Sequence, residues 1–250
     1  MKYPTISIIT IVYNGISTLQ NTIDSIACQS YPGIEYIIVD GGSVDGTIAL
    51  IESNQSAVSK WISEPDEGLY DAMNKGIDLA TGDYLWFINS GDEIYDSSTV
   101  EKVVEGFSEK LPQVVYGDTV MIDGLGNEIG ERRLQPPAQL TWDDFKNGML
   151  VSHQSILVAR SIAKKYNTKY RFSADYEWCL QALLEAELIH NSNRVLSRFL
   201  DGGLTKQNII PGLRERFDIM RRYFGLFPTV WRHIPIGIRF LWYLAKNKRF

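Results

Sequence analysis

Four short apolar segments alternate with amphipathic segments between residues 5 and 92, and this alternation limits what the chain can fold into. The apolar runs span residues 5–12, 34–39, 60–63 and 84–89. Nearly continuous apolar runs of this length are typical of strands that are buried on both faces. Apolar side chains recur at helical spacing in the intervening residues 17–29, 45–53 and 69–80. This order predicts an α/β fold with a mainly parallel sheet flanked by helices.

The remainder of the chain is less regular. Residues 114–123 and 129–134, joined by a loop with the sequence GLGN, are predicted to form a hairpin. We expect further strands at residues 153–159 and 194–200, and a helix at residues 173–186.

The bulk composition suits one large globular domain. Of the 250 residues, 44% are hydrophobic and 22% are charged, enough apolar side chains for a single large core. Two distant cysteines, Cys28 and Cys179, do not amount to a disulfide framework, which favours a reducing compartment. The apolar run near the N-terminus lacks a signal-peptide cleavage site and is too short to span a bilayer.

The charges are distributed unevenly. Residues 205–250 contain ten Lys or Arg and two Asp or Glu, about +8, whereas the rest contains fifteen and twenty-eight, about −13. An acidic body argues against a nucleic-acid partner, which would need a basic patch on the folded domain.

The basic tail has two interpretations. Arg232, Arg239 and Lys246 recur at heptad spacing. A second, apolar face of the segment 237–250 consists of Ile238, Leu241, Trp242 and Ala245. The tail is either a helix packed on the domain with its basic side in water, or an interfacial helix on an anionic membrane surface. We favour the membrane, because the aromatic and basic excess is larger than packing needs.

Polar residues follow each of the four predicted parallel strands. These segments are residues 13–15, 40–46, 64–68 and 89–93, rich in Asp, Glu, Asn and Gly. Ligands of open parallel sheets bind outside the carboxyl ends of the strands. The sequence has neither a G-x-G-x-x-G motif nor a P-loop. A site rich in carboxylates would need a divalent cation such as Mg²⁺ or Mn²⁺ to hold a phosphate ligand, and Asp92 is placed to bind it.

Several segments closely resemble family 2 glycosyltransferases of the GT-A fold. They are SIITIVYNG, IIVDGGSVDGT, SEPDEGLYDAMNKGIDLATGDYLWFINSGD, SHQ, SADYE and DGGLT. The resemblance runs from about residue 5 to about residue 205 and is strongest to the bacterial exopolysaccharide and O-antigen type, including colanic acid enzymes. It implies an inverting transfer of a sugar from a nucleotide diphosphate to an acceptor hydroxyl, with UDP as the default nucleotide and GDP as the alternative.

The resemblance also implies which residues bind the donor. They are Thr10, Tyr13, Asn14, Asp40, Gly42, Ser43, Asp45, Asp66, Glu67, Gly68, Asn74, Lys75, Asn89, Ser90, Gly91 and Asp92. Thr10 and Tyr13 would line the pocket of the base and ribose, Asp40 would read the base, and Lys75 would neutralise phosphate. A structural interpretation is open for Asp45, which could cap the helix after it.

Asp40 could act as such a cap too. Asn74 and Lys75 could instead form a solvated helix face. The NSGD segment occupies the place of the family's DxD motif, but Asn89 and Gly91 stand where the motif has Asp. Asp92 therefore remains as the expected metal ligand at the motif.

Asp175 matches the catalytic base of the family and lies near a predicted helix N-terminus, where a carboxylate is stabilised as the anion. The alternative is that Asp175 only caps this helix. Glu177 points to another side of that helix and either assists or is structural. Tyr70, His153 and Gln154 are weaker candidates for contact with the donor sugar or acceptor. Tyr70 could equally be a core residue, and the histidine, expected to open a strand, could form a structural pair with the glutamine.

These observations predict a GT-A domain over residues 1–204, with a nucleotide-sugar-binding half (1–110) and an acceptor half (111–204), followed by an amphipathic helical tail (205–250). We expect a metal-dependent hexosyltransferase, cytoplasmic and peripheral at the inner membrane face, acting on a lipid-linked oligosaccharide in surface polysaccharide synthesis. An oligomer is compatible with the sequence.

One alternative is a GT-A protein that binds sugar nucleotides without catalysis. The other is a sugar nucleotidyltransferase, although TIVYNGIST has no phosphate-binding cation.

Overall fold

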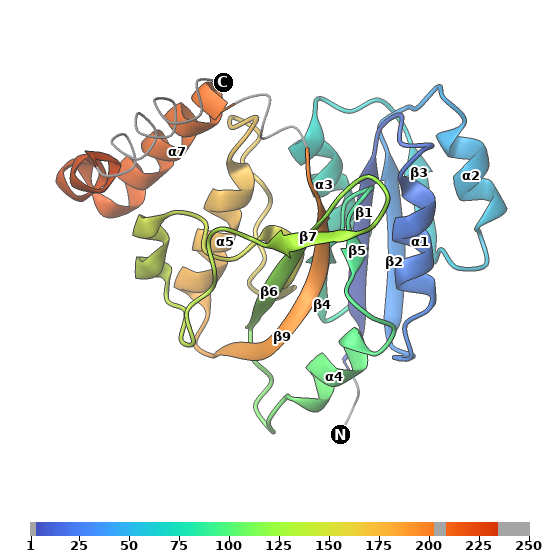
Figure 1. Ribbon diagram of the computed structural model, residues 1–250, viewed down its shortest axis with the longest axis horizontal. Coiled ribbons are helices and arrows are strands. Elements are labelled where there is room, and N and C mark those ends of the chain that lie inside the picture. The colour runs from blue at the N-terminus through green and yellow to red at the C-terminus, as the bar shows by residue number, and fades with distance from the viewer. Residues whose placement is uncertain (1–3, 203–208, 235–250) are drawn as a thin grey trace.

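One mixed sheet runs through the domain and carries helices on both faces (Figure 1). The structure is a computed structural model that describes residues 4–202 and 209–234. The first strands along the chain are β1 (Ile6–Val12), β2 (Ile34–Asp40), β3 (Lys60–Ser63) and β4 (Tyr84–Phe87). They are parallel in the order β3-β2-β1-β4. Their connections contain α1 (Leu19–Ala27), α2 (Thr47–Ser53) and α3 (Leu69–Leu79). The predicted α/β architecture is confirmed.

Both faces of the parallel strands are buried, as their apolar sequences predict. Ile9 and Phe87 belong to a core cluster with side chains of α3 and of α5 (Ala174–Glu185). Ile8 and Trp86, one residue earlier in each strand, belong to the cluster on the other face, with side chains of α1 and of α4 (Thr99–Glu105). Gly76 allows α3 to approach β1 closely, because a Cβ there would lie 2.5 Å from Cγ2 of Ile9.

The second half extends the same sheet. Its elements are β5 (Glu93–Ile94), α4 (Thr99–Glu105), β6 (Val114–Ile122), β7 (Glu128–Glu131), β8 (Ile156–Ala159), α5 (Ala174–Glu185) and β9 (Ile189–Leu200). Strand β8 is antiparallel to β4 and β6, while β9 runs parallel to β6 and antiparallel to β5. The expected hairpin is present as β6 and β7.

Two predicted boundaries in this half were wrong. The strand expected at residues 153–159 begins at Ile156, because His153–Ser155 form a short 3-10 turn in which the Ser155 amide bonds to the carbonyl of Ser152 at 2.9 Å. His153 therefore does not open a strand. The last strand begins at Ile189 instead of residue 194, since it pairs along most of β6.

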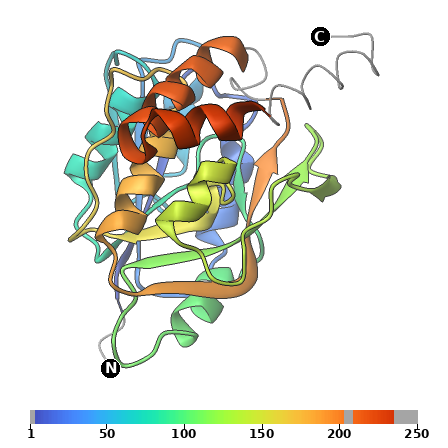
Figure 2. The same cartoon turned by 90° about the vertical axis from the view of Figure 1, so that its left-hand side faces the viewer.

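The beginning of the predicted tail is part of the domain. Helix α7 (Ile209–Phe224) lies across α5 (Figure 2). Its Ile219 and Met220 are buried in the same cluster as Leu180 of α5, and residues 226–234 form a further helix. The apolar face predicted within residues 237–250 lies outside the described residues. No helix in the described part of the chain is long and apolar enough to cross a membrane.

Candidate functional site

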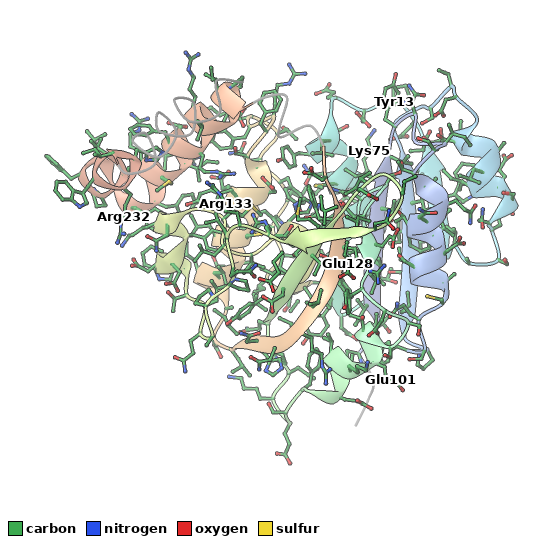
Figure 3. The ribbon with its side chains drawn as sticks, in the orientation of Figure 1. Tyr13, Lys75, Glu101, Glu128, Arg133 and Arg232 are labelled. Carbon is green, nitrogen blue, oxygen red and sulfur yellow. The ribbon has the colours of Figure 1, made fainter. Side chains whose placement is uncertain are left out.

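A pocket of about 590 Å³ lies at the carboxyl ends of β1, β2 and β3. It is lined by Tyr13, Gly41, Gly42, Pro65, Asp66, Glu67, Gly68 and Arg171. Figure 3 shows Tyr13 and Lys75 at this edge of the molecule. Five of the residues predicted to bind the sugar-nucleotide donor therefore line one pocket. Arg171 was not predicted, because it comes from the loop before α5 and no local pattern links that loop to the first three strands.

Asp40 builds the loop beside this pocket. Its Oδ2 accepts hydrogen bonds from the amides of Gly42 (3.0 Å) and Ser43 (2.9 Å) and from Oγ of Ser63 (2.6 Å), and its Oδ1 accepts one from Oγ of Ser43. The side chain is fully buried. Asp40 thus shapes the loop in this conformation, and its contact with a base stays a prediction.

The loops after β1 and β2 are bonded to each other. The amide of Asn14 donates to Oγ of Ser43 (2.7 Å), and Oδ1 of Asn14 accepts from the amide of Val44 (2.9 Å). Asp45 accepts from the amide and hydroxyl of Thr47 at the start of α2 (3.1 and 2.5 Å). The Thr47 hydroxyl is the largest cause that lowers the pKa of Asp45. Asp45 thus makes structural bonds at the start of α2, although the N-cap residue of this helix is Gly46 and not Asp45.

Thr10 lies away from the pocket. It is fully buried, and its Oγ1 donates to the carbonyl of Ile88 at 2.7 Å. This position does not fit the predicted contact of Thr10 with a base, because its hydroxyl is buried and already bonded to the backbone of the sheet. The pattern of β1 places alternate side chains on opposite faces, and Thr10 shares its buried face with Ile8.

Asn74 and Lys75 are bonded within the protein. Asn74 donates to the carbonyl of Tyr166 (2.9 Å) and accepts from its amide (2.7 Å), which fixes a loop ninety-two residues away. Nζ of Lys75 lies 2.9 Å from Oε1 of Glu64 and 2.8 Å from the carbonyl of Pro65. The bond to Glu64 is the main cause that raises the pKa of Lys75. Neither residue lies on a freely solvated helix face. The charge of Lys75 is already paired with that of Glu64.

The turn after β4 is fixed through Asp92. This carboxylate is 5% exposed, and it accepts bonds from Nε2 of Gln154 (2.8 Å) and the amide of Leu200 (3.1 Å). Burial raises its pKa to about 6 against the opposing effect of the Gln154 bond. Gly91 has a φ of 97°, which a side chain would disfavour, and its amide donates to Oγ1 of Thr22 (2.9 Å). The turn therefore ties β4 to β9 and to α1.

Asp175 connects the two halves of the chain. Its Oδ1 accepts from the hydroxyl of Tyr70 (3.0 Å), and its Oδ2 lies 3.5 Å from Nδ1 of His153. Nε2 of that imidazole lies 3.1 Å from Nδ2 of Asn89, in the turn after β4. Burial raises the pKa of Asp175, but the contacts with His153 and Tyr70 and the charge of Arg216 leave it below its usual value. The side chain is 17% exposed, so it is not fully enclosed by the protein.

Glu177, by contrast, is enclosed. Its carboxylate accepts from Arg222 (3.1 Å) and Tyr223 (3.2 Å) of α7 and from Asn167 (3.0 Å). Glu177 therefore has the structural role that the sequence analysis left open, because its bonds hold α7 against α5.

The turn after β4 also offers oxygens for a cation. Within residues 4–202 and 209–234, no three His, Cys, Asp or Glu side chains form a metal-binding group. However, Oδ1 of Asn89 is a buried oxygen without a hydrogen-bond partner. With Asp92 it would give two hard-oxygen donors, which fits Mg²⁺ or Mn²⁺ whose other ligands come from a diphosphate.

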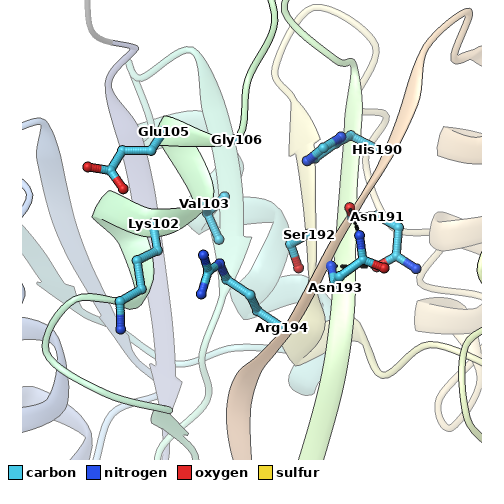
Figure 4. Close-up of a pocket in the computed structure, with 9 residues that line it drawn as sticks. All are labelled: Lys102, Val103, Glu105, Gly106, His190, Asn191, Ser192, Asn193 and Arg194. Atoms are coloured by element: carbon cyan, nitrogen blue, oxygen red, sulfur yellow. Dashed lines mark hydrogen bonds between the residues drawn. The ribbon is translucent and has the colours of Figure 1, made fainter.

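A second pocket, of about 270 Å³, lies between α4 and β9 (Figure 4). It includes Lys102, His190 and Arg194. Figure 1 places α4 at the edge opposite the carboxyl ends of the parallel strands. Burial lowers the pKa of His190, whose ring packs against Phe107. This pocket contains none of the predicted site residues.

Comparisons with known proteins point to one family. The model of the family described as Glycosyl transferase family 2 matches residues 7–166. An uncharacterized glycosyltransferase of Mycobacterium tuberculosis is 35% identical over 230 residues, which cover 88% of this chain and 86% of the relative. A PGL/p-HBAD biosynthesis glycosyltransferase of Mycobacterium bovis is 31% identical over 199 residues, 76% of this chain and 73% of the relative.

Solved structures share the fold. S. aureus TarS 1–349 in complex with UDP-GlcNAc has a TM-score of 0.69 at 16% identity, covering 92% of this chain and 73% of that one. The mannosyltransferase PcManGT from Pyrobaculum calidifontis, in complex with GDP-Man and Mn²⁺, has a TM-score of 0.67 at 14% identity, covering 100% and 77%. These similarities confirm the predicted GT-A architecture.

Proposed function

The chain belongs to glycosyl transferase family 2, and we propose that it transfers a hexosyl group from a UDP-sugar to an acceptor hydroxyl with inversion. The donor would bind in the pocket at the ends of β1, β2 and β3. What supports this placement is the convergence of Tyr13, Gly42 and the segment 66–68 on that pocket, together with the UDP-GlcNAc and GDP-Man complexes of the structural relatives.

The observation that carries the proposal is the position of Asp175. The carboxylate is anchored by Tyr70 and His153, is partly exposed and has a lowered pKa, so it is an anion at neutral pH. It would accept the proton of the acceptor hydroxyl while that oxygen forms a bond to the anomeric carbon of the donor. The bond from that carbon to the diphosphate breaks on the opposite side, and its electron pair leaves with the nucleotide.

Mg²⁺ or Mn²⁺, when bound, would supply Lewis-acid stabilisation of the leaving diphosphate. Asp92 and Oδ1 of Asn89 are the protein oxygens that would hold the ion. For Asp92 this requires exchange of a hydrogen bond from Gln154 or from the Leu200 amide.

We further propose that the acceptor is a lipid-linked oligosaccharide of surface polysaccharide synthesis and that the enzyme works at the inner membrane face. The basic tail and the exposed aromatic side chains of residues 226–234 support this location. The Mycobacterium bovis relative is described as a PGL/p-HBAD biosynthesis glycosyltransferase, and this assignment to a biosynthetic pathway is compatible with the proposal.

The test is a donor screen followed by turnover. The purified protein is incubated with UDP-glucose, UDP-GlcNAc and GDP-mannose, each with and without Mn²⁺, and the melting temperature is measured. The donor that stabilises the protein is then supplied with lipid-linked acceptors, and nucleotide release and glycosylated product are quantified. Stabilisation followed by product formation supports the proposal, whereas no stabilisation by any nucleotide sugar contradicts it.

A second function is favoured by one observation. Asn89 and Gly91 replace the acidic residues of the DxD motif, and Asp92 is already bonded on both oxygens. This fits a GT-A protein that binds a sugar nucleotide without catalysis. Binding without turnover for every acceptor tested would select this alternative.

A further inference from the structure

Arg171 is the one positively charged residue, among those the structure describes, that lines the proposed donor pocket. It is exposed, and its guanidinium forms no ion pair or hydrogen bond within residues 4–202 and 209–234. The pocket is also lined by the acidic residues Asp66 and Glu67. A nucleotide diphosphate is itself an anion, so a pocket with two carboxylates needs positive charge to hold it.

Lys75, which the sequence suggests as the residue that neutralises phosphate, is engaged within the protein. Its Nζ lies 2.9 Å from Oε1 of Glu64 and 3.5 Å from Oδ2 of Asp71, and it donates to the carbonyl of Pro65 at 2.8 Å. Lys75 would have to leave these partners in order to bind a phosphate. A phosphate contact of Arg171 breaks no bond that its guanidinium makes in the described part of the chain.

The loop that carries Arg171 is held in place by α7. Glu215 of this helix accepts hydrogen bonds from the amides of Arg171 (2.9 Å) and Phe172 (2.8 Å), one on each carboxylate oxygen. The buried Tyr170 donates its hydroxyl to Oδ2 of Asp218 at 2.8 Å. Glu215 is thus bonded to the main chain of Arg171 and forms no ion pair with its side chain. The backbone is fixed, and the guanidinium stays available to a ligand.

The same segment continues to the proposed base. Ser173 precedes α5, and its Oγ donates to the carbonyl of Gly212 in α7 at 3.0 Å. Asp175 follows in the first turn of α5. A residue that lines the donor pocket and the proposed base therefore belong to one short segment that is fastened to α7. A phosphate contact from Arg171 would fix the donor relative to the carboxylate that acts on the acceptor.

We propose that Arg171 binds a phosphate oxygen of the nucleotide diphosphate and is the donor-binding residue contributed by the second half of the chain. The inference rests on the proposed function, because it adds a residue to that same site. The other residues that line the pocket come from the loops after β1, β2 and β3. A guanidinium suits this ligand because its N–H groups match phosphate oxygens in pairs.

The test compares UDP with uridine, which share the base and ribose and differ in the diphosphate. Their affinities for the wild type, Arg171→Gln and the control Lys169→Gln are measured by NMR titration in the presence of Mn²⁺. Lys169 is an exposed residue of the same loop that does not line the pocket. We expect Arg171→Gln to weaken UDP binding at least about tenfold, the effect of losing one charge-assisted hydrogen bond, and to leave uridine binding unchanged. Lys169→Gln should bind both ligands as the wild type does.

Three outcomes overturn the inference while the proposed function stands. One is an equal UDP affinity of Arg171→Gln and the wild type. Another is a parallel loss of uridine affinity in a folded Arg171→Gln, which assigns the residue to the nucleoside or to the shape of the pocket. The third is an equal loss of UDP affinity in Lys169→Gln, which marks non-specific attraction.

The proposed function has a separate readout in the same experiment. If the wild type prefers GDP, the comparison is made with GDP and guanosine. If it binds neither nucleotide, the proposed function fails and the inference fails with it. Arg171→Gln removes no side-chain hydrogen bond of the described residues, so it should fold, and its melting temperature is measured beside that of the wild type.

Discussion

Nδ1 of His153 lies 3.5 Å from Oδ2 of Asp175, and Nε2 of the same ring lies 3.1 Å from the amide nitrogen of Asn89. Because an amide nitrogen only donates, Nε2 must accept and Nδ1 must carry the proton that faces Asp175. The turn after β4 thus sets the tautomer that holds the carboxylate as an anion.

His153→Gln should move the acid limb of the pH profile upward. The proposed base works when deprotonated, so activity falls as the pH drops through the pKa of Asp175. The imidazole helps to keep that pKa below 3.8, and without it the effect of burial raises the pKa. In the variant, kcat should therefore decline at a higher pH than in the wild type, with little change in donor KM. Superimposable pH profiles would contradict the role of the histidine.

Asp175→Asn should lower kcat by about 10²-fold or more, because a carboxamide cannot take the proton of the acceptor. Donor affinity should change little, since the donor pocket is formed elsewhere. Steady-state kinetics and nucleotide binding measure the two quantities.

Glu177→Gln is the matched control for this variant. Its carboxylate bonds to Arg222, Tyr223 and Asn167, so its loss should reduce the free energy of unfolding and leave kcat of the folded enzyme nearly unchanged. If Glu177→Gln abolishes turnover and Asp175→Asn does not, the base is misassigned.

Asp92→Ala should abolish transfer and also destabilise the protein. The sequence alone suggests a ligand on a free turn, but the structure adds the bonds to Gln154 and to the Leu200 amide. Leaving these buried donors unpaired costs about 1–3 kcal/mol. Urea unfolding measures the destabilisation, and activity is compared in Mn²⁺ and in EDTA.

Glu93→Gln, one residue further on, is the control for this position and should keep its activity. Full wild-type activity in EDTA would exclude the proposed cation, whatever the effect of Asp92→Ala on folding.

Glu35 should make stability depend on acid pH. Its carboxylate bonds to Lys60 (2.7 Å), to Ser7 (2.5 Å) and to Thr81 (2.7 Å). Burial opposes ionisation, but these bonds together lower the pKa from 4.5 to about 2. Because its pKa is lower in the folded protein than in the unfolded chain, Glu35 stabilises the fold fully above pH 4.5. This stabilisation is lost as the pH falls toward 2.

Glu35→Gln should therefore unfold more easily at pH 7, by about 1–3 kcal/mol, and show a flatter loss of stability between pH 4.5 and 2. Urea unfolding at several pH values tests this expectation. The exposed Glu52→Gln should behave like the wild type. Equal slopes for wild type and Glu35→Gln would refute the linkage.

Local patterns determine much of what could be predicted. Strand periodicity located β1 to β4, and the rule for parallel sheets then placed Tyr13 and Asp66 at one edge. Contacts across long sequence separations were not accessible in this way. Asn74 bonds to Tyr166, and Tyr70 bonds to Asp175, because the second half folds back over α3. No periodicity encodes these pairs.

The short helix 226–234 should contribute to membrane binding. Phe227 and Trp231, one turn apart, are 88% and 75% exposed, and Leu226, Val230 and Ile234 are exposed beside them. Figure 3 shows Arg232 on the outer side of this region. Aromatic side chains beside basic ones suit the interface of an anionic membrane.

Replacing Phe227 and Trp231 by Ser should weaken binding to anionic liposomes by more than tenfold without unfolding the protein. Full burial of such a side chain contributes about 1.5–3 kcal/mol, so even half of this for two side chains exceeds one decade in affinity. Sedimentation with phosphatidylglycerol and with phosphatidylcholine vesicles, at low and high salt, separates the apolar from the electrostatic contribution.

Leu125→Ser, on the exposed turn between β6 and β7, removes apolar surface elsewhere and should bind as the wild type does. If the wild type ignores anionic vesicles at low salt, this surface serves a protein contact instead, and the proposed location at the membrane is wrong.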